Sequence, residues 1–79
     1  MHLTFDETFI KEVIITLERF FGTEIQVSNE MIFECTLNST FDNPDLSEIL
    51  NVIGASIDVD IQNNNGVYTL IGKGCKPNN

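Results

Sequence analysis

A stretch of sequence that occurs twice constrains this chain more than any other feature. Residues 4–17 read TFDETFIKEVIITL and residues 40–53 read TFDNPDLSEILNVI, with a constant offset of 36. Four positions are identical in the two copies, and four more are apolar in both. Because a unit this short cannot bury its apolar face alone, the sequence predicts that the two copies pack against each other.

A second set of matches follows the first with a different offset. These pairs are 32 residues apart: Gly22 and Gly54, Ile25 and Ile57, and Val27 and Val59. The two offsets differ by four residues, which is close to one helical turn of about 3.6 residues. We therefore predict that the helix of the second copy has lost about one turn.

Apolar spacing divides the first copy into a strand, a helix and a strand. A brief strand is expected at residues 3–5, and an alternating one at residues 24–27. Asp6 or Thr8 is expected to cap the helix between them, and Gly22 to end it. Seven apolar residues at helical spacing define its buried face: Phe9, Ile10, Val13, Ile14, Leu17, Phe20 and Phe21.

The second half repeats this order and adds a hairpin. Residues 32–41 alternate as a strand does, and Asn43-Pro44 is expected to open a second helix that Gly54 ends. Strands are expected at residues 57–62 and 67–72, joined by a turn at the Asn-rich residues 63–66. The predicted fold class is α+β, with duplicated βαβ units (β-α-β-β-α-β-β), right-handed crossovers and two helices packed between small sheets.

Length and charge limit the classes of function. With 79 residues the chain is expected to form a single domain over residues 1–79, with a flexible tail at residues 73–79. Its net charge of −8 argues against nucleic acids and anionic membrane surfaces as partners, because both select clustered lysine and arginine. No apolar run approaches the roughly 20 residues of a membrane span, and no signal-peptide pattern begins the chain.

The polar residues do not form a chemical constellation. Asp6 and Asp42, and likewise Glu12 and Glu48, occupy equal places in the repeat. They are interpreted as helix caps and solvated positions rather than as paired catalytic or metal-binding carboxylates. His2 is the only histidine, which is too few for a Cys/His metal site. The sequence therefore predicts no catalytic, cofactor-binding or metal-binding residue.

The two cysteines leave two alternatives open. Cys35 alternates with apolar residues, so a buried, inert thiol is the expected state. Cys75 follows the last predicted strand. A disulfide between them is the less favoured alternative, and it requires Cα atoms within about 7 Å of each other.

The final hairpin carries the predicted partner-binding residues. If its loop has two or four residues, Ile61 pairs with Leu70 or with Tyr68 on the face that joins the core. Val67, Thr69 and Ile71 then share the opposite face with Asp58 and Asp60. These residues form a partner-docking surface, or lie beside a free edge that accepts a strand. In the alternative interpretation they are covered by another segment or stand singly exposed.

The order and spacing of these motifs resemble a known family. The segment L-E-R-F-F-G at residues 17–22, then T-F-D-x-x-x-L-S-E-I-L, then an Asn-rich hairpin ending Y-T-L-I-G resemble the C-terminal domain of FecR-type anti-sigma regulators of the Bacteroidetes. The chain is similar, more distantly, to the short N-terminal signalling domain of secretins and TonB-dependent receptors. The resemblance covers residues 3–75.

This resemblance implies a non-enzymatic, periplasmic protein-interaction domain without a cofactor. The partner it implies is the signalling domain of a TonB-dependent outer-membrane transducer. The full-length regulator would be membrane-anchored, and its cytoplasmic part would control an extracytoplasmic-function (ECF) sigma factor. The alternative is the N-terminal signalling domain of a TonB-dependent receptor or secretin itself. An enzyme of the acylphosphatase type is disfavoured, because the single arginine, Arg19, lies inside the first predicted helix.

Overall fold

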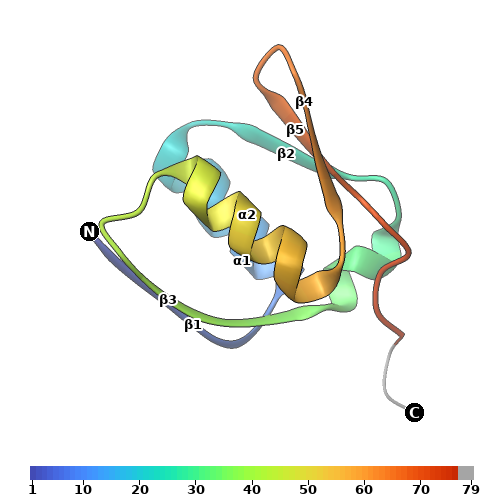
Figure 1. The fold of residues 1–79 in the computed structure, drawn as a ribbon, viewed down its shortest axis with the longest axis horizontal. Helices are drawn as coiled ribbons and strands as arrows, with labels where there is room; N and C mark the ends of the chain where they lie inside the picture. The colour runs from blue at the N-terminus through green and yellow to red at the C-terminus, as the bar shows by residue number, and fades with distance from the viewer. Residues whose placement is uncertain (77–79) are drawn as a thin grey trace.

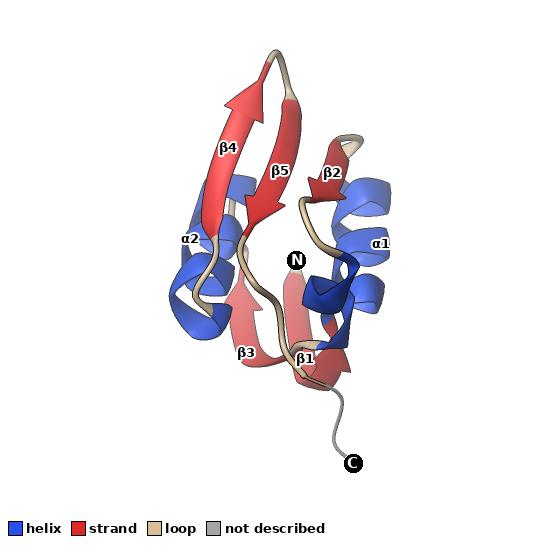
Figure 2. Cartoon of the chain, turned by 90° about the vertical axis from the view of Figure 1, so that its right-hand side faces the viewer, coloured by secondary structure: helices blue, strands red, loops and turns tan. Residues whose placement is uncertain are grey.

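The computed structural model describes residues 1–76, and Figure 1 shows how its elements follow one another. In chain order they are β1 (His2–Phe9), α1 (Ile10–Phe21), β2 (Glu24–Val27), the 3-10 helix η1 (Glu30–Glu34), β3 (Thr36–Asp42), α2 (Leu46–Ile57), β4 (Asp60–Asn64) and β5 (Val67–Ile71). One sheet pairs β1 with β3, and the other has the order β2-β5-β4. Figure 2 shows the two sheets facing each other, with the helices on the two sides between them. The predicted α+β class is confirmed.

The repeat keeps a single offset of 36 through both units. Each helix has 12 residues, and α2 begins and ends 36 residues after α1. The helix caps match as well, because Gly22 and Asp58 both adopt the left-handed conformation, with φ of 60° and 58°. The predicted loss of one turn from the second helix is therefore wrong. Gly54 lies inside α2, and Ile57 is its last residue rather than part of a strand.

Gly54 was predicted to end the second helix, but it has a different role there. A Cβ at Gly54 would lie 3.0 Å from the Val59 carbonyl oxygen, and the Val59 N–H donates to the Gly54 carbonyl at 3.1 Å. The chain leaving α2 thus folds back closely over the helix. Glycine is needed here because the backbone approaches it closely, not because the helix stops.

The first strands of the two units pair with each other. The β1–β3 ladder is antiparallel, and Thr4 lies opposite Thr40, its own counterpart in the repeat. The Phe5 and Phe41 rings, also counterparts, meet edge to face with centroids 6.4 Å apart. A local two-fold axis therefore runs between the two copies.

The last strands of the two units lie on either side of β5. β5 is parallel to β2 and antiparallel to β4. Each unit thus has its first strand in one sheet and its last strand in the other. The predicted right-handed βαβ crossovers do not form, because a crossover requires both strands in the same sheet.

The β4–β5 hairpin has a two-residue turn, the shorter of the two loop lengths that the sequence allows, because Asn64 already pairs with Val67. Asn65 and Gly66 have positive φ angles of 53° and 87°, as a type I′ turn requires. Ile61 is consequently paired with Leu70, one of the two registers that the sequence allows.

A 3-10 helix replaces the beginning of the long strand predicted at residues 32–41. The Asn29 side chain accepts a hydrogen bond from the Met31 N–H at 2.9 Å, and the Asn29 carbonyl accepts one from Ile32 at 3.0 Å. The turn buries Ile32 fully and Phe33 partly. Local capping therefore competes successfully with the strand pattern.

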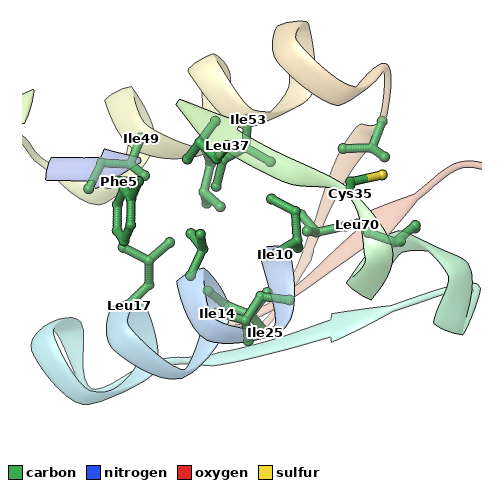
Figure 3. Packing of buried hydrophobic residues seen from close by; sticks show 14 of the residues in the cluster. Phe5, Ile10, Ile14, Leu17, Ile25, Cys35, Leu37, Ile49, Ile53 and Leu70 are labelled. Carbon is green, nitrogen blue, oxygen red and sulfur yellow. The ribbon is translucent and has the colours of Figure 1, made fainter. Parts of the chain in front are cut away.

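One hydrophobic core unites the two copies, as predicted (Figure 3). Side chains with almost no exposure form its centre: Ile10, Val13, Leu17, Ile32, Cys35, Leu37, Ile49, Ile53 and Leu70. Two residues predicted to be buried are not, because Phe9 and Phe20 remain 52% and 55% exposed. The β1–β3 register explains Phe9, which pairs with the exposed Thr36 next to the buried Leu37.

The predicted N-terminal caps of the two helices are also wrong, whereas Gly22 ends α1 as predicted. β1 runs up to Phe9, which precedes α1 without a side-chain cap. Asp6 and Thr8 instead lie at a bulge in β1, where the Asp6 N–H donates to Thr8 Oγ1 at 3.1 Å. The cap of α2 is Asp45, whose carboxylate accepts from the Glu48 N–H at 2.8 Å.

The two cysteines form a disulfide, so the expected free thiol at Cys35 is wrong. The Cα atoms of Cys35 and Cys75 are 5.0 Å apart. The Cys75 N–H also donates to the Met31 carbonyl at 3.0 Å. Gly74, with φ of +82°, passes so close that a Cβ would lie 2.6 Å from the Ile32 nitrogen. The segment predicted to be flexible therefore begins with residues held against η1, and its residues 77–79 lie outside the described part.

Candidate functional site

The residues predicted to bind a partner gather around the three-stranded sheet. Along β5, Leu70 is fully buried and Tyr68 packs against the core. Because side chains alternate along a strand, Val67, Thr69 and Ile71 point away from the core. Val67 and Thr69 are half-buried, and Ile71 is 38% exposed.

Polar side chains flank this strip on both neighbouring strands. They are the exposed residues paired with Val67, Thr69 and Ile71: Glu24 and Gln26 on β2, and Asp60, Gln62 and Asn64 on β4. The Gln26 amide donates to the Glu24 carboxylate at 2.6 Å. We call these eight residues the outer face. It is a strip of β-branched side chains between carboxylates and amides.

The structure places four of the five predicted residues on the outer face. The fifth, Asp58, is the left-handed cap of α2 and belongs to no strand. It nevertheless lines, with Asp60 and Ile71, a hollow of about 460 Å³ that Lys73 also borders. The predicted residues thus remain close together, although the strand expected to carry Asp58 begins at Asp60.

Sequence reasoning missed the contribution of β2. Glu24 and Gln26 share the outer face because β2 pairs in parallel with β5, more than forty residues later. Alternation along residues 24–27 shows which side chains lie on the same side of β2. The local sequence does not indicate which strand pairs with β2. This part of the surface requires the tertiary structure.

The two edges of the three-stranded sheet differ. At the β2 edge the Ile25 N–H donates a hydrogen bond of 3.0 Å to the Glu18 carboxylate of α1. β4 is the opposite outer strand, and Figure 2 shows no further strand beyond it. Its sequence, DIQNN, contains no proline or lysine, the residues that commonly protect an edge from pairing. β4 is therefore the more open edge of this sheet.

Neither a metal-binding cluster nor a helix able to span a membrane is present in the part of the chain that the structure describes. Residues 1–76 contain no group of three or more His, Cys, Asp or Glu side chains arranged to hold a metal ion. No helix within residues 1–76 is long and apolar enough to cross a membrane.

Comparison with known proteins identifies relatives over almost the whole chain. The family model described as FecR, C-terminal, matches residues 2–70. Two crystal structures of a proposed anti-sigma factor from Parabacteroides distasonis are similar, both at 27% identity. The TM-scores are 0.80 over 95% of this chain and 0.82 over 92%. In both comparisons this chain spans 34% of the anti-sigma factor. No curated protein matches the sequence significantly.

Proposed function

The chain belongs to the FecR C-terminal family, and we propose that it is the signal-receiving, extracytoplasmic domain of a membrane-anchored anti-sigma regulator. Its likeness to about a third of an anti-sigma factor supports this assignment. The remainder of such a regulator would carry the membrane anchor and the cytoplasmic part that controls an ECF sigma factor. Within this chain, the function is protein binding.

The disulfide supports a periplasmic location. Disulfides persist in oxidising compartments, such as the bacterial periplasm, and are rare in the cytosol. The bond between Cys35 and Cys75 closes around half of the chain, and it joins the core to the C-terminal segment. A domain built in this way suits the compartment in which an outer-membrane transducer can reach it.

The outer face carries the proposed function. Its centre is the strip of Val67, Thr69 and Ile71, and its side is the open edge of β4. We propose that the signalling domain of a TonB-dependent outer-membrane transducer binds here. A strand of the transducer would pair with β4, and its apolar side chains would cover the strip. Loading of the transducer would then change this contact and pass the signal inward.

Binding to the signalling domain of the transducer encoded beside the regulator tests this proposal. Isothermal titration calorimetry should detect association. Ile71→Asp or Val67→Asp should weaken it by about tenfold or more, because a hot-spot side chain contributes about 2 kcal/mol or more and each 1.4 kcal/mol is a factor of about ten. Ile15→Asp is a matched control, because Ile15 on α1 is 40% exposed and Ile71 is 38% exposed. Circular dichroism verifies that each variant is folded.

The contrary results are specific. If no association with the transducer domain were detected, that domain would be excluded as the partner. If Ile15→Asp and Ile71→Asp weakened the association with the transducer domain equally, the outer face would be excluded as the binding surface.

A further inference from the structure

We propose that a second surface of this domain, centred on Phe9, binds a basic segment of a partner protein that also carries apolar side chains. The surface shares no residue with the outer face and does not depend on the function proposed above. It lies where α1 begins beside η1, with the C-terminal segment passing next to η1, as Figure 2 shows.

Phe9 is a large apolar side chain without a structural role in the core. It is 52% exposed and is the last residue of β1, directly before α1. The β1–β3 register, in which it pairs with the exposed Thr36, holds it outward. Burying a phenylalanine side chain is worth about 1.5–3 kcal/mol, so a partner that covered Phe9 would gain much of this free energy.

Two adjoining hollows flank Phe9. One has a volume of about 420 Å³ and is lined by the half-buried Met31 and Phe33. The other, of about 630 Å³, reaches the disulfide and Thr36. Phe9 and Glu34 line both hollows, so the two adjoin at these side chains. We call the combined depression the Phe9 groove. Its apolar floor can receive aliphatic or aromatic side chains.

The charges around the Phe9 groove specify the occupant. Four carboxylates line the two hollows, against two ammonium groups: Glu7, Glu12, Glu30 and Glu34, against Lys11 and Lys76. The rim is therefore negative, and so is the whole chain, at −8. A segment that carries lysine or arginine beside its apolar side chains complements such a rim. A second copy of this chain would instead bring like charge to the groove.

The disulfide gives the Phe9 groove a fixed wall. Cys75 lines the second hollow, is bonded to Cys35, and donates its N–H to the Met31 carbonyl. Met31 lines the first hollow. Because these links are made before any partner arrives, little ordering free energy is lost on binding.

Fluorescence anisotropy with short labelled peptides tests the proposal. The probe is a peptide of lysine and phenylalanine residues separated by serines. One control peptide replaces lysine by glutamate, and another replaces phenylalanine by serine. The wild-type chain should bind the probe peptide and neither of the two control peptides. Phe9→Ala or Glu34→Lys should weaken binding about tenfold, the effect of losing roughly 1.4 kcal/mol. Phe20→Ala is the matched control, since Phe20 is 55% exposed but lines neither hollow.

Several results would overturn the proposal. If the glutamate peptide or the serine peptide bound as tightly as the probe, binding would not require both the positive charge and the apolar side chains. An equal loss in Phe20→Ala, or no binding of the probe, would exclude the Phe9 groove. A dimer in sedimentation that Phe9→Ala abolishes would assign the groove to a second copy of the chain. None of these results alters the transducer titration, which reports on the outer face.

Discussion

Loss of the disulfide should remove a large share of the stability of this domain. Cys35 and Cys75 are 40 residues apart in the sequence. In the loop-entropy description, a closed loop of about 40 residues lowers the entropy of the unfolded chain by roughly 13 cal/mol/K, or about 4 kcal/mol at 25 °C. A chain of this length has a total free energy of unfolding of about 4–12 kcal/mol. The reduced domain should therefore be marginally stable.

Urea denaturation with and without dithiothreitol measures this effect. With a denaturant slope of about 1–2 kcal/mol/M, the urea midpoint should fall by roughly 2–4 M on reduction. Circular dichroism reports the helices directly. Cys75→Ser is the control, and its midpoint should match that of the reduced wild type with or without dithiothreitol. This variant leaves Cys35, which is 1% exposed, in the core, so no cavity confounds the comparison.

A count of reactive thiols in the unfolded, non-reduced protein separates two ways in which the reasoning could fail. Two free thiols would show that the disulfide does not form. Complete protection of both thiols, together with a change below about 1 kcal/mol on reduction, would refute the loop-entropy argument. In that case structure retained in the unfolded chain would already restrict it, with or without the bond.

Substitutions at three further positions test individual contacts, each by urea or thermal denaturation. Asp45→Ala should cost about 1 kcal/mol, because it removes the carboxylate that caps α2. Gly74→Ala should cost about 2 kcal/mol or more, because φ is +82° and a Cβ would collide with the backbone of Met31. Glu18→Ala should cost about 1–2 kcal/mol by leaving the Ile25 N–H without its acceptor, whereas Glu18→Gln, which keeps an acceptor oxygen, should cost much less.

Features that depend on neighbouring residues were predictable from the sequence. The stripe of Val13, Ile14 and Leu17 is buried as its helical spacing indicates. The glycine after the first helix is left-handed, and the Asn-Gly turn forms a two-residue hairpin. The family could also be identified, because the order of the motifs is preserved along residues 2–70.

Features set by contacts distant in sequence were not predictable. Gly54 has the appearance of a helix stop, but its role depends on the backbone of Val59 that crosses it. Phe9 fits the helical stripe, but pairing of β1 with β3 turns it outward. The bond between Cys35 and Cys75 depends on where the C-terminal segment passes, which no pattern within either segment describes.

For the outer face too, the features set by neighbouring residues were predictable and those set by distant contacts were not. Alternation together with the turn length identified Val67, Thr69 and Ile71 as one side of a strand. The identity of the strand on the other side of β5 was not available, because parallel pairing with β2 joins distant segments without a turn. Consequently Glu24 and Gln26, two of the five polar residues that flank β5 on the outer face, could be placed there only from the structure.

The position of β5 explains why the unrepeated strand carries the candidate surface. The local two-fold axis relates β2 to β4 and orients them in opposite directions, as their pairings with β5 show. The two strands are not hydrogen-bonded to each other, and β5 joins them by pairing with both. Its inward residue Leu70 completes the core, while its outward residues Val67 and Ile71 form the centre of the outer face. Substitutions of the outward residues can therefore change binding without disturbing the core, which is the separation that the transducer titration requires.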